Sequence, residues 1–128
     1  MKIQIICIGK LKEKYWSEAS AEYMKRLSKY CDPQITELRE SKLPDKASAA
    51  DEETVIDEEG KNILKHIKEG SYVVSLEIGG KALSSEELAE KMDNLALSGR
   101  SHVTFVIGGS LGSVAVNTAV RNILPRLL

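Results

Sequence analysis

Apolar residues in this chain fall into two kinds of run, short segments rich in Ile and Val and longer stretches with helical spacing. Residues 2–8 and 72–78 are of the first kind and predict strands. Residues 102–107 are almost continuously apolar, which is typical of a strand buried on both faces of a sheet. Residues 34–40 alternate more weakly and predict one further strand.

Between these strands, apolar residues recur every three or four positions, which predicts amphipathic helices. The first helix carries a stripe that we expect to face the core, formed by Tyr15, Ala19, Tyr23, Leu27 and Tyr30. Pro33 should end it. Ser48 and Ser84 are each followed three residues later by an acidic residue, the spacing of a capping box that opens a helix. Residues 41–50 predict a loop, and residues 114–124 predict a last helix.

Alternating strands and helices predict an α/β fold with a mostly parallel sheet and helices on both faces. The 128 residues fit a single domain spanning 1–128. In such sheets, ligands bind beyond the carboxyl ends of the strands. The run Gly108-Gly109-Ser110-Leu111-Gly112 is the most site-like loop there, because its glycines let a ligand approach the backbone. A plain strand-to-helix turn explains the same run equally well.

Composition excludes several classes of protein. Hydrophobic residues make up 42% of the chain and charged residues 29%, and no apolar run is long enough for a membrane span. The start of the chain lacks the features of a signal peptide, and two cysteines are too few for a disulfide scaffold. We therefore expect a cytoplasmic protein that contacts no membrane.

Charge is distributed unevenly along the chain. Residues 1–31 carry seven Lys or Arg against three acids, which predicts either a phosphate-facing patch or a solvated helix face. Within this segment Tyr15 and Trp16 could stack on bases, although Tyr15 also belongs to the predicted core stripe. The acidic run 51–59 is most simply interpreted as the solvated face of a helix.

Isolated His and Cys residues do not predict a metal site. His66 and His102 lie far apart in the sequence, and neither has a second His or a Cys at metal-ligand spacing. Cys7 is expected to be a small buried side chain in its strand, and Cys31 has no local His or Arg to activate it. We expect no bound metal.

Several short segments, taken together, resemble one family. They are Met1–Ile3, Gly9–Trp16, Ala21–Tyr23, Lys25–Leu27, Glu58–Gly60, Leu76–Lys81, Leu83–Ser85 and Phe105–Ser110. They resemble the ribosomal RNA large subunit methyltransferase H family, small SPOUT-class enzymes. The resemblance implies methylation of N3 of a pseudouridine in 23S rRNA, with S-adenosylmethionine as methyl donor and the ribosome as partner. It also implies a homodimer, a knotted α/β fold, and cofactor contacts at Leu76 and Gly108.

The resemblance ends near Gly112, where family members continue with a cofactor-binding segment and a final helix that contributes to the dimer. Residues 113–128 do not resemble that continuation. A truncated or frameshifted chain is therefore expected, with an incomplete knot and without the C-terminal cofactor-binding segment. Two alternatives stay open at this point: a non-enzymatic remnant that binds RNA or protein, and a nucleotide-binding domain that uses the 108–112 loop.

Overall fold

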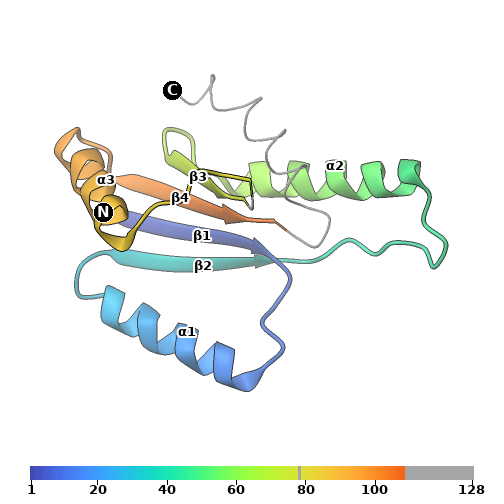
Figure 1. Ribbon diagram of the computed structural model, residues 1–128, viewed down its shortest axis with the longest axis horizontal. Helices are drawn as coiled ribbons and strands as arrows, with labels where there is room; N and C mark the ends of the chain where they lie inside the picture. The colour runs from blue at the N-terminus through green and yellow to red at the C-terminus, as the bar shows by residue number, and fades with distance from the viewer. Residues whose placement is uncertain (78, 109–128) are drawn as a thin grey trace.

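Strands and helices alternate throughout the computed structural model, which describes residues 1–77 and 79–108. The strands of this part are β1 (Lys2–Ile8), β2 (Asp32–Leu38), β3 (Tyr72–Leu76) and β4 (His102–Ile107). The helices are α1 (Lys14–Leu27), α2 (Ala49–His66) and α3 (Ser85–Leu97). The predicted α/β architecture is confirmed (Figure 1). Ile78, the loop residues 109–112 and the predicted helix 114–124 lie outside the described residues.

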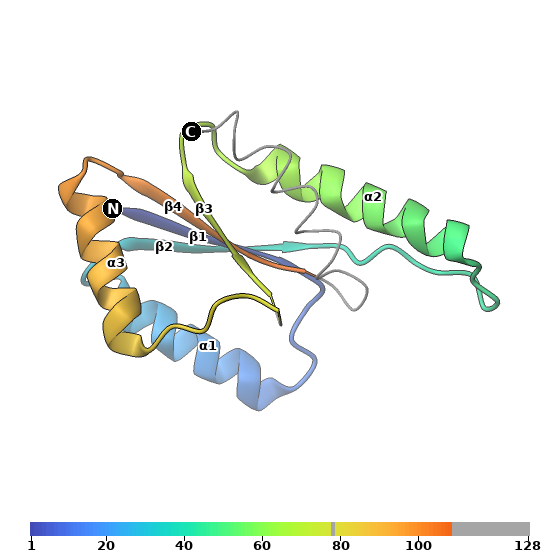
Figure 2. The same cartoon turned by 45° about the horizontal axis from the view of Figure 1, so that its top comes forward.

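The four described strands form one sheet in the order β2-β1-β4-β3, and every neighbouring pair is parallel. The steps from β1 to β2 and from β3 to β4 run in the same direction across the sheet, whereas the step from β2 to β3 runs the opposite way. Right-handed crossovers then place α1 and α3 on one face and α2 on the other. Figures 1 and 2 both show α1 and α2 on opposite sides of the sheet.

The core lies between α2 and the sheet. Residues paired in register point to the same face, so Ile6, Val106 and Leu38 share the face that α2 covers. These side chains and Val73 pack against Ile63 of α2 in one buried cluster. Burial of these aliphatic groups is the main source of stability in this half of the molecule.

A capping box begins each of the helices α2 and α3, at the positions that the sequence predicts. The Oγ of Ser48 accepts a hydrogen bond from the Asp51 backbone N–H at 3.2 Å, and the Ser48 N–H donates to the Asp51 carboxylate at 2.9 Å. Ser84 and Glu87 make the same reciprocal pair at 3.1 and 3.2 Å. Both predicted helix starts are therefore confirmed, because each box satisfies N–H groups that the helix itself leaves free.

The second strand was placed too late by the alternation pattern. It occupies residues 32–38 rather than 34–40, with Pro33 inside it. The Asp32 N–H donates to the Met1 carbonyl in the direction of β1, so the nitrogen of the next residue faces away from the sheet. Because β2 is an edge strand, Pro33 removes no hydrogen bond from the ladder.

The expectation that the first helical stripe faces the core was wrong. No residue of α1 is buried, and the aromatic side chains of the stripe are exposed. Tyr30, at 84% exposure, lies beyond the end of the helix at Leu27. The physical reason is position: α1 packs mainly on β2, the edge strand, so much of its apolar stripe extends past the sheet.

Substitution of Ile63 by Ala tests where stability resides. Ile63 is fully buried against the sheet, so its truncation should lower the free energy of unfolding by about 2–5 kcal/mol. Leu97→Ala on exposed α3 is the matched control and should change it by less than about 0.5 kcal/mol. Urea unfolding followed by circular dichroism measures both, and equal effects would contradict a core centred on α2.

Candidate functional site

The carboxyl ends of the four described strands meet at one edge of the sheet, as Figures 1 and 2 show by the direction of the arrows. The segments that leave this edge begin at Gly9, Arg39, Glu77 and Gly108. In parallel α/β sheets this edge is where backbone groups and loop side chains are free to contact a ligand. It is therefore the candidate functional site of the molecule.

Leu76 and Gly108, far apart in the sequence, come together here. Leu76 is the last residue of β3 and pairs in register with Ile107, the residue before Gly108. Leu76 and Ile107 lie on the α3 side of the sheet and are 51% and 42% exposed. An apolar pair open at a sheet edge can cover the flat face of a ring system. The role of Leu76 and Gly108 in binding a cofactor stays a prediction.

Glu77 places a carboxylate at the same edge but on the other side of the sheet, because Ser75, which binds it, pairs in register with Val106 of the α2 face. Its Oε1 accepts a hydrogen bond from the Ser75 Oγ at 3.0 Å, which holds the carboxylate beside the end of β3. The remaining acceptor positions of the carboxylate can take donors such as hydroxyl or amino groups. Sequence reasoning did not identify Glu77, and the signal available was its place directly after the strand.

Gly9 opens the segment that leaves β1, the strand beside β4. Its N–H donates to the Leu38 carbonyl at 2.8 Å, and its φ of 92° lies in the region that favours glycine. This turn sends the chain away from the sheet and into the basic segment 10–14, which leads to α1. The N-terminal basic segment and the end of β4 therefore share the same edge.

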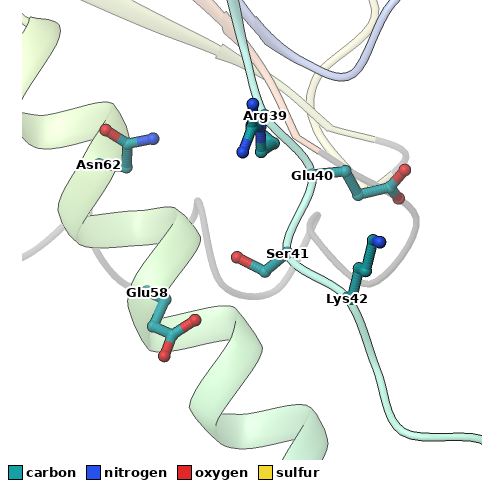
Figure 3. Close-up of a pocket in the computed structure, with 6 residues that line it drawn as sticks. All are labelled: Arg39, Glu40, Ser41, Lys42, Glu58 and Asn62. Carbon is teal, nitrogen blue, oxygen red and sulfur yellow. The ribbon is translucent and has the colours of Figure 1, made fainter.

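A groove of about 700 Å³ lies at the same edge, beyond β2. One wall is the segment that follows β2, and the other is α2 (Figure 3). Its lining residues are Arg39, Glu40, Ser41, Lys42, Glu58 and Asn62. Cationic and anionic side chains alternate along it, so the groove has no single sign of charge.

Glu59, next to this groove on α2, was missed by sequence reasoning. The acidic run 51–59 was interpreted as a solvated face, yet Glu59 is only 5% exposed and its Oε2 has no hydrogen-bond partner. Burial raises the pKa of this carboxyl, a backbone hydrogen bond from Ser41 lowers it, and the nearby charge of Glu40 raises it further. The available signal was spacing, because Glu59 stands four residues from both Val55 and Ile63, which are buried.

The isolated His and Cys residues do not gather at this edge. His66 is exposed on α2, and its Nδ1 lies 2.8 Å from the Asn62 carbonyl oxygen. His102 begins β4 at the opposite edge, where burial and the charges of Lys68 and Lys2 lower its pKa. Burial and the charge of Glu37 raise the pKa of the Cys7 thiol, which disfavours the reactive thiolate.

Two further searches cover the described residues 1–77 and 79–108. Within them, no three His, Cys, Asp or Glu side chains are grouped so as to hold a metal ion. No helix there has the length and apolar character needed to cross a membrane.

Comparison with known proteins gives consistent matches. A family model described as a predicted SPOUT methyltransferase matches residues 1–123. Proteins named Ribosomal RNA large subunit methyltransferase H from Clostridium novyi (strain NT) and Alkaliphilus oremlandii (strain OhILAs) are 54% and 50% identical over 112 residues. A protein of the same name from Acetivibrio thermocellus is 49% identical over the same length. Each alignment covers 88% of this chain and 70% of the relative.

Replacement of Glu59 by Gln tests the buried carboxyl. The pKa of Glu59 in the folded state lies above the ordinary value of 4.5. Its protonated form therefore stabilises the folded state, and this contribution is complete at pH values below 4.5. This contribution is lost as the pH rises through the folded-state pKa. Glu59→Gln should remove that loss and raise the melting temperature at pH 7, with a flatter pH profile. The exposed neighbour gives the control Glu58→Gln, which should follow the wild type. If the melting temperatures of the wild type and both variants depended on pH in the same way, the identification of Glu59 as a buried carboxyl with a raised pKa would be contradicted.

Proposed function

Because the chain belongs to the SPOUT methyltransferase family, we propose that it transfers a methyl group from S-adenosylmethionine to RNA of the large ribosomal subunit. The observation that carries this proposal is the identity of 54% over 112 residues with a protein named for that reaction class. The acceptor we propose is N3 of a pseudouridine in 23S rRNA, on the resemblance of segments 9–16, 76–81 and 105–110. Under this function the protein works in the cytoplasm, where ribosomes are assembled.

The residues at the carboxyl edge fit S-adenosylmethionine chemically. The exposed side chains of Leu76 and Ile107 offer an apolar surface for the adenine ring. The Glu77 carboxylate, held by Ser75 on the α2 side of the same edge, can accept hydrogen bonds from the hydroxyl or amino groups of a ligand that extends around the end of β3. The ligand carries no phosphate, so the absence of a phosphate-gripping Lys from the 108–112 run agrees with this ligand.

In this proposal Leu76 and Gly108 hold the methyl donor, which supplies an activated methyl group. Gly108 has no side chain to keep a ligand away from the backbone at the end of β4. Transfer to a ring nitrogen depends mainly on holding donor and acceptor in line, because correct positioning alone lowers the barrier substantially. The contribution of the edge is therefore orientation, and pairing of β3 with β4 makes that orientation rigid.

A second copy of the chain is the partner that we propose for the face carrying α1 and α3. Apolar side chains on these helices are exposed, and they include Tyr23, Leu27 and Leu88. Exposed apolar groups on two helices of one face favour association, because burial removes that surface from water. This agrees with the homodimer that the family resemblance implies.

Leu76→Asp tests the methyl-donor site. We expect the wild type to transfer labelled methyl groups to 23S rRNA, and the variant to bind S-adenosylmethionine at least about tenfold more weakly, which corresponds to about 1.4 kcal/mol. Titration calorimetry measures the affinity. Leu97→Asp, on an exposed position of α3, controls for the added charge. Equal affinities of wild type and Leu76→Asp would remove Leu76 from the site. RNA binding without methyl transfer by the wild type would favour the non-enzymatic alternative.

Leu27→Asp tests the proposed dimer. Sedimentation velocity over a range of protein concentrations should show a dimer for the wild type and a dissociation constant at least about tenfold higher for the variant, since the Asp charge would be buried without a partner. Glu53→Gln on the opposite face is the control, and its dissociation constant should match that of the wild type. A wild-type protein that stays monomeric at every concentration would contradict the dimer.

A further inference from the structure

Two aromatic rings stand side by side and exposed at the start of α1. The ring centroids of Tyr15 and Trp16 are 5.3 Å apart with an interplanar angle of 50°. The two residues are 61% and 56% exposed. An aromatic side chain can bury 150–250 Å² when it packs, so leaving two neighbouring rings in water forgoes a large stabilisation. Such a pair is better explained by a ligand that packs on it than by the fold alone.

The pair lies near the edge where the methyl donor is proposed to bind. Only residues 9–14 separate it from the carboxyl end of β1, and β1 lies directly beside β4 in the sheet. Figures 1 and 2 show that α1 begins on the side of the molecule to which the strands point. A chain that passes over Tyr15 and Trp16 can therefore continue to the end of β4.

Positive charge surrounds the rings. Lys10, Lys12 and Lys14 are exposed within the five residues that precede Tyr15. Lys14 forms an exposed ion pair with Glu18 at 3.8 Å. Within residues 1–77 and 79–108, neither Lys10 nor Lys12 has an ion-pair partner. With Glu13 among them, the three lysines give the segment 10–14 a net charge of +2 beside the aromatic pair.

We propose that Tyr15 and Trp16 form a stacking platform for unpaired bases of the RNA substrate, with Lys10 and Lys12 contacting its phosphates. Single-stranded RNA is bound by this combination, aromatic faces for the bases and cations along the backbone. A base inside a helix cannot reach a methyl donor, so the acceptor must leave its stack, and neighbouring bases then need a surface to pack on. The proposal rests on the proposed function, whose substrate is RNA.

A second copy of the chain is the other occupant to consider for the same rings. The cores of protein interfaces are depleted in Lys, whereas this surface has three within five residues. Basic residues also occur near the end of α1 (Lys25, Arg26 and Lys29), so charge does not separate Tyr23 and Leu27 from the start of the helix. What distinguishes the start of α1 is the exposed pair of Tyr15 and Trp16 next to the carboxyl edge of the sheet.

Trp16 is the only tryptophan in the chain, so its fluorescence reports directly on this surface. Titration with a short single-stranded oligouridylate, without S-adenosylmethionine, should quench the emission to saturation, and a duplex RNA of equal length should change it little. Fluorescence polarisation of labelled oligouridylate extends the test to variants without Trp16. Trp16→Ala should bind about tenfold more weakly and Trp16→Phe close to wild type, because stacking needs a ring.

The lysines and a distant aromatic residue supply the controls. Lys10→Ala combined with Lys12→Ala should reduce the slope of log affinity against log salt by about 1.4, because each phosphate contact to a single strand contributes about 0.7. Tyr30→Ala, exposed beyond the other end of α1, should leave affinity unchanged. Circular dichroism spectra identical to wild type would confirm that each variant is folded.

Two results would overturn the platform. One is wild-type affinity of Trp16→Ala for the oligouridylate. The other is Trp16 emission that changes with protein concentration and not with RNA, because a second copy would then cover the rings. Methyl transfer to 23S rRNA by wild type and Trp16→Ala at equal rates would refute the platform and leave the proposed function intact. Stacking on Trp16 without methyl transfer would do the reverse.

Discussion

Hydrogen bonding of β1 to a parallel strand on each side organises the whole carboxyl edge. All seven residues of β1 pair in register with β2, and six of them pair with β4. Parallel pairing makes the strands end together, which brings Gly9, Leu38 and Ile107 to one edge. Residues separated by about a hundred positions in the chain thereby become neighbours, and β3 adds Leu76 to the same edge through its pairing with β4.

The helices cover the two faces of this sheet to very different extents. On one face α2 covers a cluster of buried aliphatic side chains, and the core of the molecule lies there. On the other face neither α1 nor α3 has a buried residue, although both carry apolar stripes. A parallel sheet is stable when both faces are covered, so surface left open on one face is surface available to partners. The start of α1 lies next to the carboxyl edge of the sheet, and its end leads back to the start of β2 at the opposite edge.

Glu59 shows how a local pattern can mislead. Six acids within nine residues suggest a solvated helix face, and five of them stay outside the core. The helical repeat nevertheless places Glu59 between Val55 and Ile63, in the row that packs on the sheet. Burial then disfavours the charged form and raises the pKa of the carboxyl. Composition indicated polarity, and the geometry of the helix determined burial.

The sequence by itself determined the kinds of element and most of their boundaries. The patterns that define these elements act over a few residues, so they can be recognised without a structure. They are the Ile- and Val-rich segments, the Ser-x-x-acid capping boxes and the helical spacing of apolar residues. It also indicated the carboxyl ends of the third and fourth strands as the place for a ligand, with Leu76 and Gly108 drawn from a family resemblance. Tertiary structure alone decided which strands are neighbours, and it placed Pro33 in an edge strand, where it costs no hydrogen bond of the ladder. It also decided that the apolar stripe of α1 is exposed and that Glu59 is buried. These outcomes depend on contacts between residues distant in the chain, and periodicity shows only that a face is apolar, not what covers it.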